Sequence, residues 1–208
     1  MSTAIATGRM IVIDDEPAVA KAIASAGKSI GLEVEVFDSC ESYLAKTQAP
    51  GPCCVVLDLK LPGMSGLELL KKLGRDGYMP SVIMISGHGT IESAVAAMRH
   101  GAVTFVEKPF SYHALLQHVT DSLAVAAKNW EQFAERKRAI ALLEALKPRE
   151  RELLHLLVKG HSNKQMAPLL SMSVRGVEDR RSRIMQKLEV ESVAELCRIV
   201  HVAGERVK

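Results

Sequence analysis

CCVVLDLKLPGMSG, at residues 53–66, sets the architecture of the first half of the chain. Residues 53–57 are apolar at every position, which is typical of a strand buried on both faces of a parallel sheet. Asp58 ends this run, and Pro62 with Gly63 marks the turn that follows. The stretch therefore predicts a central strand whose carboxyl end carries a carboxylate.

Similar short apolar runs recur along the chain up to about residue 110. They lie at residues 10–13, 34–37, 53–57, 81–85 and 103–106. The segments between them place apolar residues at helical spacing, as in Leu67, Leu70 and Leu73. Strands that alternate with helices in this way predict an α/β fold, with a doubly wound five-stranded parallel sheet of the flavodoxin-like kind.

The remainder of the chain has a helical pattern only. Residues 112–146 carry apolar side chains mostly three, four or seven positions apart, which predicts one amphipathic helix, two helices in series or a coiled-coil linker. Beyond Pro148, short helices are expected at residues 148–158, 163–170, 174–188 and 192–202. A three-residue turn joins the second to the third, which is typical of a helix-turn-helix. The expected parts are an α/β domain at residues 1–125, a long linker helix at 126–145 and an all-α four-helix domain at 146–208.

Composition places the chain among compact globular proteins. Of its 208 residues, 48% are hydrophobic and 25% are charged, which supplies a buried core and excludes a disordered tail. No apolar run approaches the roughly 20 residues of a membrane span, so we expect a cytoplasmic protein with no membrane partner. The four cysteines lack the spacing of a disulfide framework or a metal site and are expected to be small buried hydrophobic residues.

The formal net charge of +3 conceals an uneven distribution of charge. Residues 1–125 hold 10 Lys plus Arg and 13 Asp plus Glu, whereas residues 126–208 hold 17 and 11. The first part is therefore net acidic, at −3, and the second is net basic, at +6. The second part is the candidate for binding a polyanion.

Three carboxylates follow two of the expected strands. Asp14 and Asp15 come just after the first strand, and Asp58 comes just after the third. The carboxyl ends of strands in a doubly wound sheet share one edge, where such carboxylates would repel one another unless a cation lay among them. Hard oxygen ligands favour Mg²⁺. The alternative is that these acids are helix N-caps and solvated loop charges.

A hydroxyl and an ammonium group reach the same edge of the sheet. Ser86 ends the fourth strand and Lys108 ends the fifth. With the carboxylates they supply a nucleophile, a hydrogen-bond donor and a cation, which are the parts that phosphoryl transfer requires. No second set of nucleophile and base accompanies them, so we expect no separate phosphatase or hydrolase activity.

VIDDEP, VVLDLKLPGMSG, MISGHGT and FVEKPF together resemble the receiver domain of two-component response regulators, over about residues 9–125. The resemblance implies that Asp58 is the phosphoacceptor, which takes a phosphoryl group from a sensor histidine kinase. It also implies that Mg²⁺ is held by Asp14 or Asp15, by Asp58 and by the backbone carbonyl of Lys60.

The same resemblance assigns roles to residues after the fourth and fifth strands. Ser86 and Lys108 would bind the phosphoryl oxygens, and Phe105 occupies the position of the switch aromatic, whose ring turns inward as Ser86 moves. Lys60 and His88 stand where members of the family tune hydrolysis of the phosphoryl group. The bond between Lys108 and Pro109 is expected to be cis.

The stretch LKPRERELLHLLVKGHSNKQMAPLLSMSVRGVEDRRSRIMQKL, at residues 146–188, resembles the LuxR-type helix-turn-helix of the FixJ/NarL family, and most of all its FixJ branch. The resemblance covers about residues 145–208. Residues 174–188 would then be the recognition helix, and residues 163–170 the scaffold helix before it. The residues expected at double-stranded DNA are Arg175, Val177, Glu178, Asp179, Arg180, Arg181, Arg183 and Lys187, with Lys164 on the scaffold helix. A solvated helix face is the alternative for such a run of arginines.

Several positions depart from the family pattern. Lys147 stands where a Thr is usual, so the hydroxyl that would pair with Glu150 in a capping box is lost. Pro168 is expected to kink the scaffold helix or to loosen its first turns. Gly176 replaces a usual Thr and Arg180 a common His, and the acid Asp179 lies near the expected base-reading positions, so the DNA sequence that is read stays open.

These observations lead to one functional hypothesis and one alternative. The chain is expected to be a transcriptional regulator in which phosphorylation of Asp58 controls binding to promoter DNA, through homodimerisation and with RNA polymerase as a further partner. The alternative is a receiver whose output domain acts through protein–protein interaction. A stripe on the last helix, with Val193, Leu196, Cys197 and Val200, would either mediate dimerisation or pack on the core of its own domain.

Overall fold

The computed structural model describes residues 8–46, 51–74, 77–87 and 89–204. Its contacts divide the chain into two compact units, Met1–Glu131 and Gln132–Lys208. Within the described residues, no helix is both long enough and apolar enough to cross a membrane. Each unit is built around a hydrophobic core of its own.

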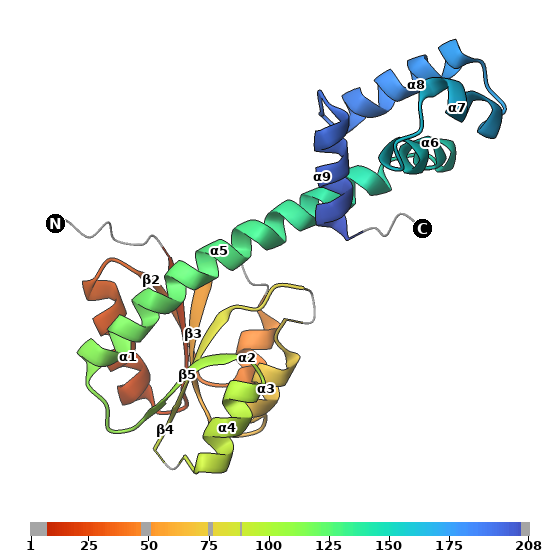
Figure 1. The fold of residues 1–208 in the computed structure, drawn as a ribbon. Coiled ribbons are helices and arrows are strands. Elements are labelled where there is room, and N and C mark those ends of the chain that lie inside the picture. The colour runs from red at the N-terminus through yellow and green to blue at the C-terminus, as the bar shows by residue number, and fades with distance from the viewer. Residues whose placement is uncertain (1–7, 47–50, 75–76, 88, 205–208) are drawn as a thin grey trace. The chain divides into compact units, whose positions relative to one another are not determined.

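The N-terminal unit is an α/β sandwich (Figure 1). In chain order its elements are β1 (Arg9–Ile13), α1 (Pro17–Ser29), β2 (Glu33–Phe37), α2 (Cys40–Ala45), β3 (Cys53–Asp58), α3 (Gly66–Lys72), β4 (Ser81–Ser86), α4 (Ile91–Arg99), β5 (Ala102–Glu107) and the start of α5 (Tyr112–Glu144). The five strands are parallel and lie in the order β2-β1-β3-β4-β5. This order confirms the doubly wound sheet predicted from the apolar runs.

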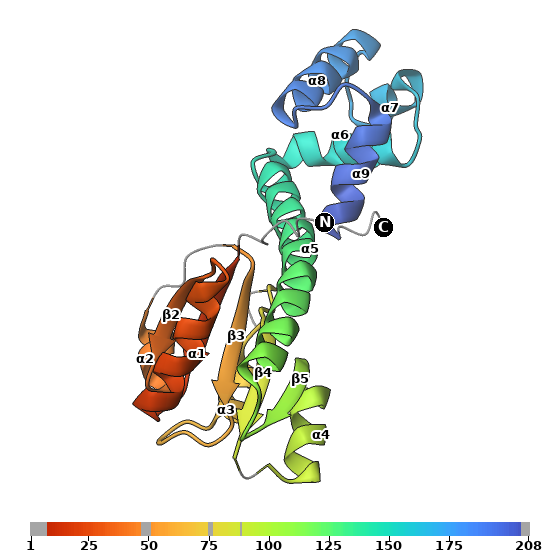
Figure 2. The same ribbon diagram turned by 90° about the vertical axis from the view of Figure 1, so that its left-hand side faces the viewer.

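Helices cover both faces of this sheet, with α1 and the first half of α5 on one face and α2, α3 and α4 on the other (Figures 1 and 2). Successive residues of a strand point to opposite faces. Val55 and Leu57 of β3 therefore join the cluster beneath α2 and α3, whereas Cys54 and Val56 join the cluster beneath α1 and α5. Burial on both faces explains why β3 is apolar throughout.

The helix α5 is continuous from Tyr112 to Glu144, so the structure selects one helix over two in series. Leu115, Val119 and Leu123 pack on the sheet of the N-terminal unit, whereas Ala139 and Leu143 belong to the core of the C-terminal unit. The two compact units meet within this helix. The predicted division into residues 1–125, 126–145 and 146–208 stays a prediction.

The C-terminal unit continues with α6 (Pro148–Val158), α7 (Asn163–Leu169), α8 (Val174–Lys187) and α9 (Val193–Ala203). Leu196 and Val200 of α9 are buried in the core of this unit, beside Leu153 and Leu157 of α6. This part of the stripe on the last helix therefore packs on its own domain. Val193 and Cys197 are half-buried.

Two departures from the family pattern leave the first turns of α6 and α7 intact. The carboxylate of Glu150 still accepts a hydrogen bond of 2.9 Å from the backbone N–H of Lys147, so half of the capping box remains and α6 begins at Pro148. In α7, Ser162 and Gln165 form a complete capping box around the first turn. Pro168 lies in the last turn of α7, so the expected loosening of the first turn is not found.

Candidate functional site

Four polar side chains meet at the carboxyl edge of the sheet. Asp58 is the last residue of β3 and Ser86 the last residue of β4, while Asp14 follows β1 and Lys108 follows β5. β1 lies between β2 and β3, so the strand order reverses beside β1, and the carboxyl ends of the strands at such a reversal are where doubly wound folds bind ligands. The structure thus brings two of the three predicted carboxylates, Asp14 and Asp58, to the same edge as the hydroxyl residue and the cation.

Lys108 lies at the centre of the acidic group. Its Nζ is 2.9 Å from Oδ2 of Asp14, 2.9 Å from Oδ2 of Asp58 and 3.2 Å from Oε1 of Glu16. Asp14 and Asp58 are only 2% and 5% exposed, so both carboxylates depend on partners inside the protein. One half-buried cation therefore bridges three acids.

The electrostatics of the site follow from burial and from this bridge. Burial raises the pKa of Asp14, and hydrogen bonds from Lys108 and from the backbone N–H of Glu16 oppose that rise. Burial would lower the pKa of Lys108, but its hydrogen bonds to Asp58 and Asp14 outweigh this effect and raise the pKa above its ordinary value. Lys108 is therefore a permanent cation at the edge of the sheet.

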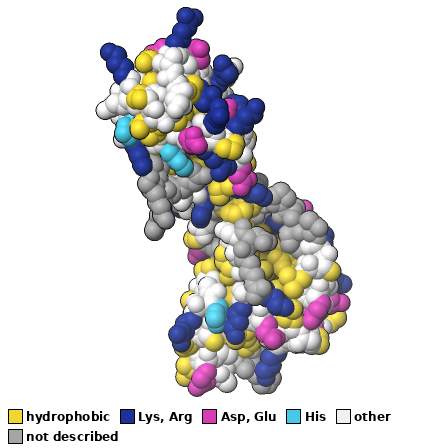
Figure 3. Space-filling model, turned by 90° about the vertical axis from the view of Figure 1, so that its right-hand side faces the viewer, with side chains coloured by type: hydrophobic (Ala, Val, Ile, Leu, Met, Phe, Trp, Pro, Cys, Tyr) yellow, Lys and Arg dark blue, Asp and Glu magenta, His cyan; other side chains and the backbone are white. Residues whose placement is uncertain are grey.

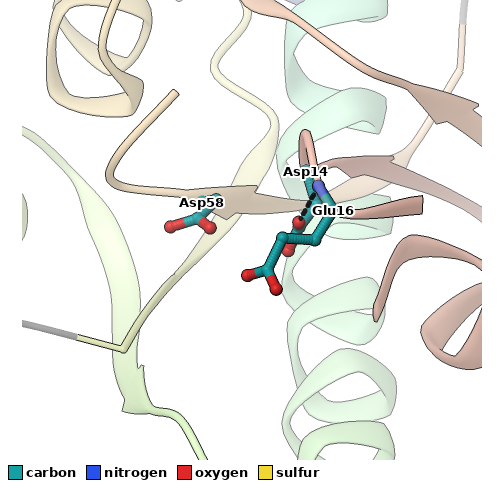
Figure 4. Close-up of side chains that lie close together, drawn as sticks. All are labelled: Asp14, Glu16 and Asp58. Atoms are coloured by element: carbon teal, nitrogen blue, oxygen red, sulfur yellow. Dashed lines mark hydrogen bonds between the residues drawn. The ribbon is translucent and has the colours of Figure 1, made fainter. Parts of the chain in front are cut away.

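The acids also form a cluster that could hold a metal ion. Within the described part of the chain, carboxylate oxygens of Asp14, Glu16 and Asp58 all lie within 4.8 Å of one another (Figure 4). Glu16 was not expected there, although it is the third acid in a row after β1. Its backbone N–H donates to Oδ1 of Asp14 at 2.9 Å, which folds its side chain toward Asp58. Asp15 is exposed and lies outside this group, so its role as a ligand stays a prediction.

The turn after β3 is held close to Asp58. The backbone N–H of Lys60 donates to Oδ1 of Asp58 at 3.2 Å, and the carbonyl of Asp58 lies against Gly66 at the start of α3. A β-carbon on Gly66 would overlap this carbonyl oxygen, so the approach requires glycine. The role of the Lys60 carbonyl in binding a metal stays a prediction.

Ser86 and Phe105 occupy neighbouring strands. Ser86 is buried, and its carbonyl accepts a hydrogen bond of 2.8 Å from the backbone N–H of Lys108. The half-buried ring of Phe105 lies against the loop after β4, where a β-carbon on Gly89 would be 2.6 Å from Cζ of the ring. The Lys108–Pro109 bond is cis, as the resemblance implied. His88 lies outside the described residues.

In the C-terminal unit, α8 presents one fully exposed face. Its members are Arg175, Asp179, Ser182 and Gln186, which recur every three to four residues and therefore share one side of the helix. Val177 and Ile184 on the opposite side are completely buried. Figure 3 shows that Lys and Arg side chains project widely from this unit.

Two cations of α8 are engaged with neighbouring helices. Nη1 of Arg181 donates to Oδ1 of Asn163 on α7 at 3.4 Å, and Nδ2 of Asn163 donates to Oε1 of Glu178 at the same distance. Nζ of Lys187 lies 2.8 Å from both carboxylate oxygens of Glu150 on α6. These side chains therefore fix α8 to the rest of the unit.

Comparison with known proteins covers most of the chain. Residues 10–120 match the response regulator receiver domain, and residues 144–200 match the luxR family of bacterial regulatory proteins. Transcriptional regulatory protein FixJ of Azorhizobium caulinodans is 39% identical over 193 residues, which are 93% of this chain and 92% of that protein. Response regulator protein TmoT of Ectopseudomonas mendocina is 36% identical, over 95% of this chain and 90% of that protein.

Solved structures agree with these relatives. The response regulator StyR has a TM-score of 0.80 and 34% identity, over 94% of this chain and 98% of that chain. Full-length FixJ from B. japonicum has a TM-score of 0.56 and 33% identity, over 95% and 97%. The chain belongs to the response regulator family. It joins a receiver domain to a LuxR-type domain and regulates transcription under the control of phosphorylation.

The residues that were expected to contact DNA differ in their exposure to solvent in this response regulator. Val177 is 0% exposed and packs in the core, so its expected contact with DNA is wrong, because its side chain points away from solvent. The other residues expected at DNA keep their predicted contacts as predictions. The exposed ones are Lys164, Arg175, Glu178, Asp179, Arg183 and Lys187, and the half-buried ones are Arg180 and Arg181.

Ser182 and Gln186 were missed by the sequence-based expectation, which followed charge. Both lie on the exposed face of α8 that also carries Arg175 and Asp179. Helical spacing from Arg175 is the signal that would have found them. Polar side chains without charge can contact base edges, so these two are added to the candidates for DNA recognition.

Proposed function

We propose that Asp58 is the phosphoacceptor of this response regulator and that a sensor histidine kinase is the donor. The observation that carries the proposal is the ion pair between the buried Asp58 and Lys108, whose Nζ and Oδ2 atoms are 2.9 Å apart. A carboxylate held by a cation at an open strand end can attack phosphorus, and the same cation can then bind the oxygens of the transferred group.

The transfer is a single displacement. A carboxylate oxygen of Asp58 attacks the phosphorus of a phosphohistidine, so that a P–O bond forms as the P–N bond breaks. The electron pair of that bond stays on the histidine nitrogen, which takes up a proton. The product is an aspartyl phosphate with nearly two negative charges beside Lys108.

Mg²⁺ is the proposed cofactor of this transfer. Asp14, Glu16 and Asp58 supply hard oxygen ligands within 4.8 Å of one another, and this donor set suits Mg²⁺. Asp15 and the backbone carbonyl of Lys60 are the further ligands that the family resemblance suggests. When bound, the ion neutralises charge on the phosphoryl oxygens. Lys108 and the N–H of Lys60 meanwhile orient the two oxygens of Asp58.

Phosphorylation is proposed to act on the surface near β4 and β5. Ser86, at the end of β4, would turn its hydroxyl toward the phosphoryl group, and the ring of Phe105 would follow into the space that Ser86 leaves. Because Gly89 has no side chain, the ring of Phe105 can lie against the loop that follows β4. A local charge thereby changes the packing of the α4–β5 surface.

This surface supports homodimerisation as the next step. Ile91, Val95 and Met98 of α4 are 82%, 50% and 48% exposed, and Val103 of β5 is 43% exposed. Adjacent apolar side chains of this size favour burial against a second copy. Dimers would present two α8 helices to promoter DNA in the cytoplasm, where contact with RNA polymerase would complete the regulation of transcription.

The decisive experiment compares Asp58→Asn with Asp121→Asn. Asp121 is an exposed acid on α5 and serves as the matched control. Incubation with a small-molecule phosphodonor and Mg²⁺ should label the unchanged chain and the control, with the acid-labile, hydroxylamine-sensitive bond of an acyl phosphate. Asp58→Asn should not be labelled. Equal labelling of Asp58→Asn would overturn the assignment.

A second measurement tests the output. Binding of the full chain to DNA should weaken steeply as salt rises, because Lys and Arg contacts to phosphates release counterions. Beryllofluoride, which mimics a phosphoryl group, should shift the chain toward dimers in sedimentation and tighten DNA binding. Binding that is flat across salt concentrations would favour an output domain that acts on proteins, and monomers in both states would remove dimerisation.

A further inference from the structure

The C-terminal unit contains a cleft of about 450 Å³ between the start of α6 and the side of α8. Its lining residues are Lys147, Pro148, Arg149, Glu150, Arg180 and Arg183. Four of these six residues are cations, and they come from two helices that are separate in sequence. The cleft is therefore a hollow whose walls are predominantly basic.

The single acid in this wall is already neutralised. Both carboxylate oxygens of Glu150 lie 2.8 Å from Nζ of Lys187, and one of them also accepts the backbone N–H of Lys147 at 2.9 Å. These bonds lower the pKa of Glu150, so it is ionised at neutral pH and its charge is balanced by Lys187. Lys187 itself does not line the cleft.

None of the four cations of the wall forms an ion pair of its own in the described part of the chain. Within residues 8–46, 51–74, 77–87 and 89–204, no carboxylate forms an ion pair with Lys147, Arg149, Arg180 or Arg183. Like charges around one hollow repel one another unless an anion lies among them. An anionic ligand would supply the missing charge, and guanidinium groups suit phosphate oxygens because their N–H groups bind two oxygens at once.

The position of the cleft indicates which phosphate it would meet. Arg180 and Arg183 are three residues apart on the flank of α8, next to the exposed face that carries Asp179, Ser182 and Gln186. DNA bound to that face would place its phosphate backbone next to Arg180 and Arg183. Phosphates that border a groove bind side chains and helix starts beside the reading helix.

We propose that this cleft binds a backbone phosphate of the DNA, and that Lys147 and Arg149 at the start of α6 contact it together with Arg180 and Arg183. The proposal rests on the proposed DNA-binding function and adds a site outside the recognition helix. It assigns to α6 a role in affinity that does not depend on base sequence, because phosphates are the same at every base pair.

The test measures binding of the full chain, with Mg²⁺ and beryllofluoride, to a mixed-sequence DNA duplex by fluorescence anisotropy across a range of salt concentrations. The variant is the double substitution Lys147→Gln and Arg149→Gln. The controls are Lys159→Gln, an exposed cation at the other end of α6, and circular dichroism of every variant to verify the fold. The slope of log affinity against log salt should become less steep by about 1 for each phosphate contact that is lost.

Each outcome has a separate meaning. A reduced slope in the double variant, with an unchanged slope in Lys159→Gln, supports the cleft. An unchanged slope in a folded double variant overturns the cleft while the DNA-binding function stands. Equal reductions in the double variant and the control show a diffuse basic surface and also overturn it. If the unchanged chain binds no DNA at any salt concentration, the proposed function and the cleft both fail.

Discussion

Lys108 and Asp58 form an ion pair of 2.9 Å across the ends of β5 and β3, two strands that are not neighbours in the sheet. The same ammonium group is 2.9 Å from Asp14, so the two most buried carboxylates of the edge share one cation. The pair places the cation beside the proposed phosphoacceptor, and the cation also reduces the repulsion between the two carboxylates.

Removal of this cation should therefore have opposite effects on two measurements. Lys108→Gln leaves the carboxylates of Asp14 and Asp58 without their shared partner, so Mg²⁺ should bind several-fold more tightly in a calorimetric titration. Phosphoryl uptake from a small-molecule donor should fall. Lys71→Gln, an exposed residue of α3 with the same change of charge, should alter neither quantity. Weaker Mg²⁺ binding in Lys108→Gln would contradict the arrangement described above.

Gly66 should tolerate no side chain. A β-carbon there would overlap the backbone carbonyl oxygen of Asp58, and backbone atoms of a buried strand cannot easily move aside. Gly66→Ala should cost roughly 1–3 kcal/mol of unfolding free energy in urea and should slow phosphorylation by shifting Asp58. Gly87→Ala is the control, because its nearest heavy atom would be Cβ of Lys108 at 3.9 Å. Equal stability of the two variants would count against this packing.

The four thiols should differ in reactivity toward iodoacetamide. Burial raises the pKa of Cys40 to about 11 and also raises the pKa values of Cys53 and Cys54, so little thiolate forms there at neutral pH. Cys197 on α9 is half-buried and accessible in part. Mass spectrometry of the native chain should find Cys197 alkylated first, with the other three modified after addition of urea. Equal rates for all four in the native chain would be incompatible with the burial of the first three.

The pair between Glu150 and Lys187 should stabilise the C-terminal unit in a pH-dependent way. Hydrogen bonds from Lys187 and from the backbone of Lys147 lower the pKa of Glu150 in the folded state. The folded chain therefore holds fewer protons than the unfolded chain, so this contribution is present above the ordinary pKa of 4.5 and is lost as the pH falls through the lowered value. Because Lys187 is 41% exposed, the contribution is expected to be about 1 kcal/mol or less.

Hydrogen exchange of α6 and α8 amides measures this contribution. Glu150→Gln should reduce protection at neutral pH, and the difference from the unchanged chain should shrink in acid. Glu189→Gln, which breaks an ion pair with Arg138 that is exposed on both sides, should have little effect at either pH. A loss of protection in Glu150→Gln that is the same at all pH values would point to packing and not to charge.

Arg181 and Arg183 should separate stability from DNA affinity, although both are arginines of α8. Arg181 bonds to Asn163 on α7, so Arg181→Ala should lower the Tm of the C-terminal unit. Arg183 is exposed, so Arg183→Ala should leave the Tm nearly unchanged and reduce the salt slope of DNA binding by about 1. If instead Arg183→Ala lowered the Tm and Arg181→Ala reduced the salt slope, α8 would face DNA with its other side.

Much of this molecule follows from local patterns in the sequence. The buried runs at β3 and β4 specify strands because apolar side chains at successive positions need cover on both faces of a sheet. Once the sheet is parallel, the positions of Asp58, Ser86 and Lys108 at strand ends place them at one edge without further information. The helical nature of α8 likewise follows from its spacing of apolar residues.

Tertiary structure alone decided which side chains of a cluster meet. Glu16 joins Asp14 and Asp58 because the loop after β1 folds its N–H onto Asp14, and loop conformation depends on contacts that sequence spacing does not contain. Val177 lies in the hydrophobic core, and the basic cleft is lined by residues from the start of α6 and from α8. Periodicity determines which residues share a face of a helix, but the packing of neighbouring helices determines which face is buried and which charges are neutralised.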